Sequence, residues 1–168
     1  MKRRVIVKAW LLGVFTTLLG KFRLTIADQI TNIPDTTSSE FRSFIDTLLP
    51  EYLTPSGSQL GVHEKVLHIA RLNPQSLELI RNGCDWLTAQ AQGLGFESFK
   101  QAPEHAQIAI VSRAEKTPAN EVARQFFQWT HYHAFRQHYS QERAWQYLKF
   151  DGPPQPRGFM DHSKYPKA

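Results

Sequence analysis

Apolar side chains recur along this sequence with the spacing of an α-helix, and proline or glycine interrupts most of the runs. The clearest run covers residues 38–49. Its apolar members, three or four residues apart, share one helical face; they are Phe41, Phe44, Ile45, Leu48 and Leu49. No segment alternates apolar and polar residues in the manner of a half-buried strand. The pattern therefore predicts an all-α fold.

The capping-box pattern Thr37-x-x-Glu40 predicts where the first helix begins, and Pro50 ends it. Further helices are expected between proline and glycine stops, with Ser140 capping the last one. The expected helices cover residues 38–49, 62–72, 74–92, 103–116, 119–138 (the longest) and 141–148. Residues 54–61 are expected to form a turn-rich loop, and residues 96–102 a short connector.

The length of 168 residues, of which 41% are hydrophobic, is sufficient for one domain with one core. The sequence predicts a small bundle of five or six helices with an irregular, proline-rich C-terminal tail. The expected organisation is an export segment over 1–27, a linker over 28–37, a helical domain over 38–150 and the tail over 151–168.

Residues 1–27 have the three parts of a signal peptide. Lys2-Arg3-Arg4 is a positive n-region, residues 9–19 are an apolar h-region, and Thr25-Ile26-Ala27 places small residues before Asp28. The apolar run is too short to span a bilayer comfortably, which takes about 20 residues. An uncleaved N-terminal membrane anchor is the alternative.

The order Arg3-Arg4-Val5-Ile6-Val7-Lys8 resembles a twin-arginine export signal, with Arg3, Arg4 and Lys8 as its basic residues. An ordinary secretory signal with a chance arginine pair is the alternative. The twin-arginine route carries proteins that are already folded, typically with a cofactor inside. We therefore expect a periplasmic protein, and the rest of the chain must account for the cofactor.

The positive charge of the chain lies in this segment. Six Lys and Arg residues and no Asp or Glu precede residue 28. Removing those six charges from the formal net charge of +5 leaves −1. A nucleic-acid-binding protein needs a basic patch on its folded domain, so we expect no nucleic-acid partner.

Cys84 is the only cysteine, which excludes an intrachain disulfide and any site built from several cysteines. It lies within an apolar helical pattern, where a buried and inert thiol is common. The alternative is an interchain disulfide to a partner, because a single cysteine in an exported protein can pair between chains.

The sequence has no motif for a dinucleotide, for c-type haem or for a nucleophilic serine. Histidines gather in one predicted helix at positions 131, 133 and 138. His131 and His138 are seven residues apart, whereas a helical metal pair needs a spacing of three or four. Surface or interface histidines are the better interpretation. The carboxylate pairs Asp46/Glu51 and Glu78/Asp85 are expected on solvated helix faces.

The C-terminal tail combines aromatic residues with four prolines. Proline lowers the entropy cost of ordering an extended segment, and aromatic residues and arginine are favoured at interfaces. Such a segment can lie across its own domain or across a partner. The expected interface residues are Trp145, Tyr147, Pro153, Pro154, Pro156, Arg157 and Phe159.

Two regions resemble the small, third subunit of gluconate 2-dehydrogenase and related membrane-associated sugar dehydrogenases. The first is Phe44-Ile45-Asp46-Thr47-Leu48-Leu49-Pro50 with Thr54-Pro55-Ser56-Gly57-Ser58 and Gly61-Val62. The second is Ala144-Trp145-x-x-Leu148-x-Phe150-x-Gly152-Pro153-Pro154-Gln155-Pro156-Arg157-Gly158-Phe159. Family members commonly have Gly-Trp, Leu-Gly-Tyr, Gly-Pro-Pro and Pro-x-Gly-Tyr there. This chain departs mildly from that pattern, at Ala144, Lys149, Phe150 and Phe159.

The resemblance implies a complex of three subunits. A large flavoprotein of the glucose–methanol–choline type holds FAD and the substrate, and a multihaem cytochrome c passes electrons towards the quinone pool. The small subunit is non-catalytic, has neither cofactor, stabilises the flavoprotein and supplies its export signal. Membrane association would then come through the complex.

Two other hypotheses remain open from the sequence. One is a stand-alone periplasmic helical enzyme that uses a metal near His131 and His138. The other is a structural protein anchored in the membrane by an uncleaved N-terminus.

Overall fold

The structure is a computed structural model that describes residues 33–145, and every regular element in this part of the chain is a helix, with no strand. The sequence prediction of an all-α bundle is therefore confirmed. The elements are α2 (Asp35–Leu48), α3 (Val62–Arg71), α4 (Pro74–Gly93), the 3-10 helix η1 (Phe99–Gln101), α5 (Glu104–Lys116), α6 (Val122–Tyr139) and the short α7 (Glu142–Trp145).

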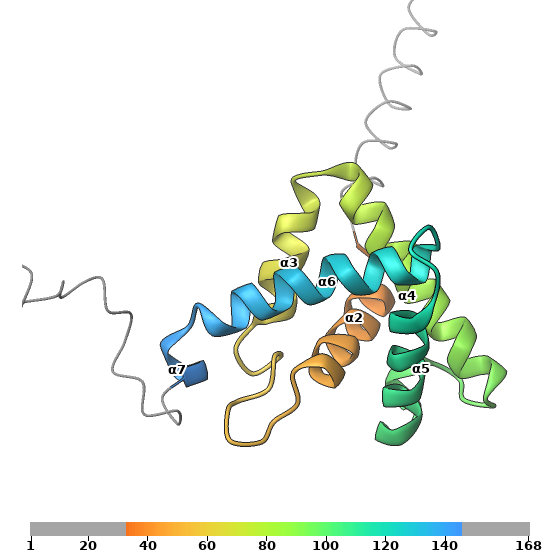
Figure 1. Ribbon diagram of the computed structural model, residues 1–168, viewed down its shortest axis with the longest axis horizontal. Helices are drawn as coiled ribbons and strands as arrows, with labels where there is room; N and C mark the ends of the chain where they lie inside the picture. The colour runs from red at the N-terminus through yellow and green to blue at the C-terminus, as the bar shows by residue number, and fades with distance from the viewer. Residues whose placement is uncertain (1–32, 146–168) are drawn as a thin grey trace, which may run out of the picture.

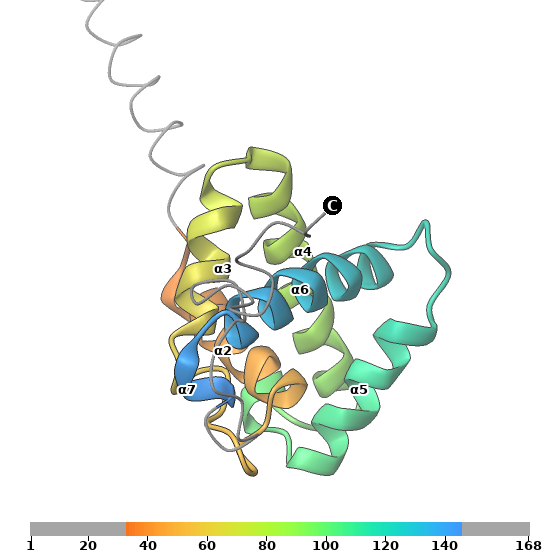
Figure 2. The same cartoon turned by 60° about the vertical axis from the view of Figure 1, so that its left-hand side comes forward.

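Helix α6 runs across the bundle on the outside of the other helices (Figure 1). It packs against α3, α4 and α5, and α2 lies beneath it against α4, α5 and η1. A view turned by 60° shows α3 on one side of α6 and α5 on the other, while α4 crosses behind α6 (Figure 2). Helix α6 is therefore the element that joins the two sides of the bundle.

Four fully buried phenylalanines from α2, η1 and α6 form the centre of the core. The Phe126 ring stacks on Phe44 with centroids 4.7 Å apart and contacts Phe41 at 6.3 Å. Phe44 also meets the edge of Phe99 at 6.5 Å. Full burial of one such side chain contributes about 1.5–3 kcal/mol, so this cluster holds three elements together.

Gly83 allows α6 to approach α4 closely. A Cβ built on Gly83 would lie 2.2 Å from Cγ of Phe126. Real Cβ atoms do not come this near to another carbon, so any side chain at position 83 must displace the Phe126 ring. The α4–α6 distance therefore depends on glycine at this position.

The start of α2 differs from the sequence prediction. The helix begins at Asp35 with Pro34 as its N-cap, so residues 35–37 of the expected linker are helical. The predicted capping box is wrong, because Glu40 is not in the first turn. Its side chain is 6% exposed and accepts a hydrogen bond from the backbone N–H of Lys100 at 3.0 Å.

Three further expectations are corrected. Helix α6 is not the longest described helix, because it has 18 residues and α4 has 20. It is shorter than expected because residues 118–121 form a turn before it. Ser140 does not cap α7: it is the C-cap of α6, and its hydroxyl donates to the carbonyl of Gln137. The connector over 96–102 contains η1, which places Phe99 in the core. The proline-rich tail lies outside the described residues.

None of the helices within residues 33–145 is long and apolar enough to cross a membrane.

We expect the variant Gly83→Ala to be destabilised by about 1–3 kcal/mol, the usual cost of overpacking a core. Urea denaturation followed by circular dichroism measures this change. Gly93→Ala in the same helix is the matched control, because a Cβ there meets nothing within 4 Å. The control should keep its stability or gain up to about 1 kcal/mol from helix propensity. Equal stability of the two variants would contradict the assigned role of Gly83.

Candidate partner-binding site

The loop between α2 and α3, residues 49–61, exposes two adjacent apolar side chains at its tip. Tyr52 is 86% exposed and Leu53 is 61% exposed. A neighbouring pair of large apolar residues in water gains nothing for the folding of this domain, whereas aromatic and aliphatic residues on a rigid support are typical of binding surfaces. Tyr52 and Leu53 therefore suit a binding surface only if the loop that carries them is rigid.

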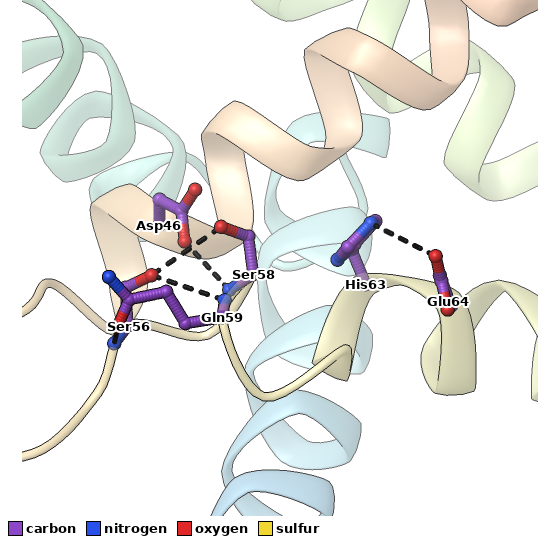
Figure 3. Close-up of polar contacts among 6 residues, drawn as sticks. All are labelled: Asp46, Ser56, Ser58, Gln59, His63 and Glu64. Atoms are coloured by element: carbon purple, nitrogen blue, oxygen red, sulfur yellow. Dashed lines mark hydrogen bonds and ion pairs between the residues drawn. The ribbon is translucent and has the colours of Figure 1, made fainter.

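Asp46 of α2 fixes the returning arm of the loop. Its Oδ1 atom accepts a hydrogen bond from the backbone N–H of Ser58 at 2.8 Å (Figure 3). A hydrogen bond to an ionised carboxylate is about twice as strong as one between neutral groups. The loop is thus tied to the helix that precedes it.

Gln59 joins the two arms of the same loop. Its Oε1 accepts from the backbone N–H of Ser56 at 3.0 Å, and its Nε2 donates to Oε2 of Glu51 at 2.7 Å. The hydroxyls of Ser56 and Ser58 lie 3.4 Å apart beside these bonds (Figure 3). The tip residues therefore project from a base that is closed by side-chain hydrogen bonds.

Gly57 lies directly against α2. A Cβ at position 57 would be 2.5 Å from Cγ2 of Ile45, and the Gly57 N–H donates to the carbonyl of Leu49 at 2.9 Å. The Gly57 carbonyl accepts from the N–H of Val62, the first residue of α3. The glycine in the Thr-Pro-Ser-Gly-Ser motif thus sets the path of the chain between the two helices.

The loop borders a hollow of about 620 Å³ that also involves α7. Its lining comprises Glu51, Tyr52, Leu53, Thr54, Pro55, Gln59 and Arg143. Arg143 lies in the short helix that leads into the C-terminal tail. The first region on which the family resemblance is based therefore meets α7, the helix in which the second region begins, at this hollow.

Only one of the predicted interface residues falls within the described residues. Trp145 is half-buried and packs against the core of its own domain, so part of its indole serves the fold. The others lie outside the described residues and stay predictions: Tyr147, Pro153, Pro154, Pro156, Arg157 and Phe159. The export residues Arg3, Arg4 and Lys8 also lie outside them.

Asp46 and Glu51 have a structural role that differs from the sequence prediction of a solvated helix face. Both carboxylates hold the loop, through Ser58 and Gln59 respectively. The turn residues at 54–61 indicated a loop, but no local pattern links a carboxylate in α2 to an amide twelve residues later. No sequence pattern indicated a binding role for Tyr52 and Leu53, which are simply two apolar residues between Pro50 and Pro55.

The histidines of α6 stack on aromatic rings. The His131 ring lies between Phe127 at 5.6 Å and Phe135 at 4.2 Å, and His133 lies 4.3 Å from Trp129. His138 is 1% exposed, and burial lowers its pKa, which keeps it neutral near pH 7. Within residues 33–145, no group of three or more metal-ligating side chains could hold an ion.

His63, at the start of α3, lies close to the loop. Its Nε2 is 3.9 Å from Oε1 of Glu64 (Figure 3). Burial lowers the pKa of His63 and Arg42 acts in the same direction, while Glu64 and Asp46 oppose them. The imidazole is therefore mainly neutral near pH 7, and it contributes little charge to the loop.

Cys84 is buried, with 2% of its surface exposed, and its Sγ lies 3.8 Å from the carbonyl of Thr37. Burial, followed by the negative charges of Glu40 and Asp85, raises the pKa of the thiol. A protonated, enclosed thiol reacts slowly. The inert-thiol interpretation agrees with this position. An interchain disulfide stays a prediction that requires the sulfur to become exposed.

Asp46→Ala should lower the free energy of unfolding by about 1.5–3 kcal/mol, the range for hydrogen bonds to charged groups. Glu64→Ala is the control, because Glu64 is exposed and its partner His63 is mainly neutral near pH 7, so that this contact contributes at most about 1 kcal/mol. Urea denaturation compares the two variants. The loop would not be fixed by Asp46 if both variants lost the same stability.

We expect Cys84 to resist alkylation by iodoacetamide in the native protein and to react fully in urea, because the thiol is buried and its pKa is raised. Mass spectrometry of samples taken over time measures both reactions. A non-reducing gel of the protein from its native source tests the alternative. A species of higher mass that disappears on reduction would show that Cys84 forms an interchain disulfide.

Comparison with known protein families identifies the chain. Residues 40–152 match the family described as gluconate 2-dehydrogenase subunit 3. This range includes all of the loop, the whole of α3 to α7 and the beginning of the tail. Neither a curated protein nor a solved structure matches the chain. Since the match covers more than half of the sequence, the chain belongs to the gluconate 2-dehydrogenase subunit 3 family, whose description implies dehydrogenase partners.

Proposed function

We propose that this chain is the non-catalytic small subunit of a periplasmic FAD-dependent dehydrogenase complex of the glucose–methanol–choline type that oxidises a sugar or gluconate. It binds and stabilises the large flavoprotein subunit and carries it through twin-arginine export. The observation that carries this proposal is the family match over residues 40–152, which follows an N-terminal Arg3-Arg4 pair in the same chain.

The described residues support a binding role. The α2–α3 loop presents Tyr52 and Leu53 on a base fixed by Asp46, Gln59 and Gly57. A surface that is ordered before binding loses little conformational entropy when a partner docks. Such a loop suits a subunit whose task is to hold another protein.

In this proposal the cofactors belong to the partners. FAD would lie in the large subunit, and haem c would lie in a multihaem cytochrome subunit that completes the complex at the periplasmic face of the inner membrane. The route for folded cargo then serves a flavoprotein that is loaded with FAD before export, and one signal serves two polypeptides.

Export of the flavoprotein should depend on the arginine pair. The full chain is co-expressed with its large subunit, and periplasmic and cytoplasmic fractions are compared by immunoblot and by FAD fluorescence. With Arg3→Lys/Arg4→Lys, both polypeptides should remain in the cytoplasm. Arg23→Lys is the matched control, because it makes the same exchange in the same segment outside the pair, and it should leave export unchanged.

The escort role would be wrong if the flavoprotein reached the periplasm equally well with the arginine pair replaced. Affinity purification of the small subunit from the cytoplasmic fraction measures binding separately. Recovery of the flavoprotein there would support the subunit assignment even if the export route were different.

A further inference from the structure

Helix α6 has the composition of a helix that is covered on both sides. A surface helix of a single domain normally places charged residues opposite its apolar stripe. The buried stripe of α6 contains Ala123, Phe126, Thr130, Ala134 and His138. The opposite side, which we call the outward face, contains Gln125, Gln128, Tyr132, Arg136 and Tyr139. No Asp, Glu or Lys occurs between Val122 and Tyr139.

A row of rings with four-residue spacing borders the outward face on one side and ends at Tyr139 of the face itself. Phe127, His131, Phe135 and Tyr139 follow one another with centroid distances of 5.6, 4.2 and 5.9 Å. Tyr139 is 48% exposed. Because neighbouring rings restrict each other's rotamers, a partner that docks here orders few additional side chains.

The centre of the outward face and its other border contain residue types that contribute most of the binding free energy at protein interfaces. Trp129 lies 4.3 Å from His133, and the Tyr132 ring meets His133 edge-on at 5.1 Å. Arg136 Nη1 donates to the Tyr132 hydroxyl at 3.2 Å, while 57% of the Tyr132 surface is exposed. Tyr, Trp and Arg are the residues most enriched among binding hot spots.

The charge of α6 indicates what kind of partner fits. Arg124 and Arg136 are its charged side chains, and the nearest acidic residues along the chain stand beyond its two ends, at Glu121 and Glu142. Complementary potentials steer association and fix register. The matching surface therefore carries carboxylates among apolar groups. A second copy of α6 on the same face would bring Arg136 towards like charges, which disfavours self-association.

The outward face differs from a lipid-binding surface. Helices that lie in a membrane interface bury aliphatic and aromatic side chains beneath a lysine- and arginine-rich polar face. The midline of the outward face instead consists of Gln125, Gln128, Tyr132 and Arg136, and none of its residues is Leu, Ile or Met. Glutamine and tyrosine at the centre favour the hydrogen-bonding surface of a protein.

The position of α6 makes this face accessible and places it next to α7. Figure 1 shows α6 on the outside of the bundle, with α7 following it. Helix α6 contacts α7, which ends at Trp145, where the predicted interface of the tail begins. A partner seated on α6 would thus lie beside α7 and Trp145.

We propose that the outward face of α6 binds an acidic, partly apolar surface of the large FAD-containing subunit. This inference rests on the proposed function, and it names the surface that carries the contact. Tyr132 and Arg136 are its centre, and the ring rows on either side exclude water from them.

The test uses the full chain and its large subunit, with the dissociation constant measured by biolayer interferometry. Tyr132→Ser/Arg136→Glu should raise the dissociation constant at least about 30-fold, as expected for loss of a hot spot. Ile108→Ser/Arg113→Glu is the matched control: it makes the same kind of change on the exposed side of α5. The control should stay within about threefold of the wild type, the small effect of positions outside a hot spot.

Gln128→Glu provides a second variant that keeps the side-chain volume and the helix propensity. It places a negative charge on the outward face and should weaken binding as well. Circular dichroism and thermal melting confirm that each variant is folded. Binding by the wild type should also weaken as salt increases, and this dependence should be smaller for Arg136→Glu.

The experiment distinguishes a failure of the proposed function from a failure of the inference about α6. If the wild type does not bind the large subunit, the proposed function fails. If wild type and all α6 variants bind equally, the proposed function stands and the inference about α6 is wrong. The inference is also overturned if the wild type forms a dimer that Tyr132→Ser/Arg136→Glu abolishes. Vesicles of phosphatidylserine and phosphatidylcholine that bind through α6 would overturn it in favour of a lipid surface.

Discussion

The contact between Phe126 and Gly83 sets the position of α6, and most of the structure depends on it. Because Gly83 has no side chain, the Phe126 ring reaches the backbone of α4 and stacks on Phe44. Phe44 in turn contacts Phe99 of η1, so the rings of Phe126 and Phe44 together link α2, α4, α6 and the connector. The same contact fixes the rotation of α6 about its axis and therefore determines which residues form its outward face.

The sequence predicted the helices well because their signals are local. Pro74, Gly93 and Pro118 mark helix limits within a few residues of where the structure has them. The predictions are wrong where the structure of a segment depends on a residue that is distant in the sequence. Glu40 lies in a pattern typical of a capping box, yet its carboxylate binds the amide of Lys100, sixty residues later. A helix start that is predicted from four adjacent residues cannot take a hydrogen-bond partner sixty residues away into account.

The candidate site shows the same division between local and distant causes. The residues Thr-Pro-Ser-Gly-Ser predicted a turn, and the structure has one. The turn is held rigid by Asp46 and Ile45 of α2. These residues come close to Ser58 and Gly57 only when the chain has folded. The ring row of α6 has a spacing of four and could have been recognised, but its exposure depends on which side of the helix Phe126 fixes to the core.

A folded-protein export route constrains when the proposed subunits must meet. If one signal serves two chains, the complex has to form before translocation and persist during it. A partner surface that must first fold would pay its ordering entropy at that moment and bind less tightly for the same area. The base of the α2–α3 loop and the ring rows of α6 are held by contacts within their own domain. Surfaces of this kind can bind as soon as the domain folds, which is the order of events that shared export requires.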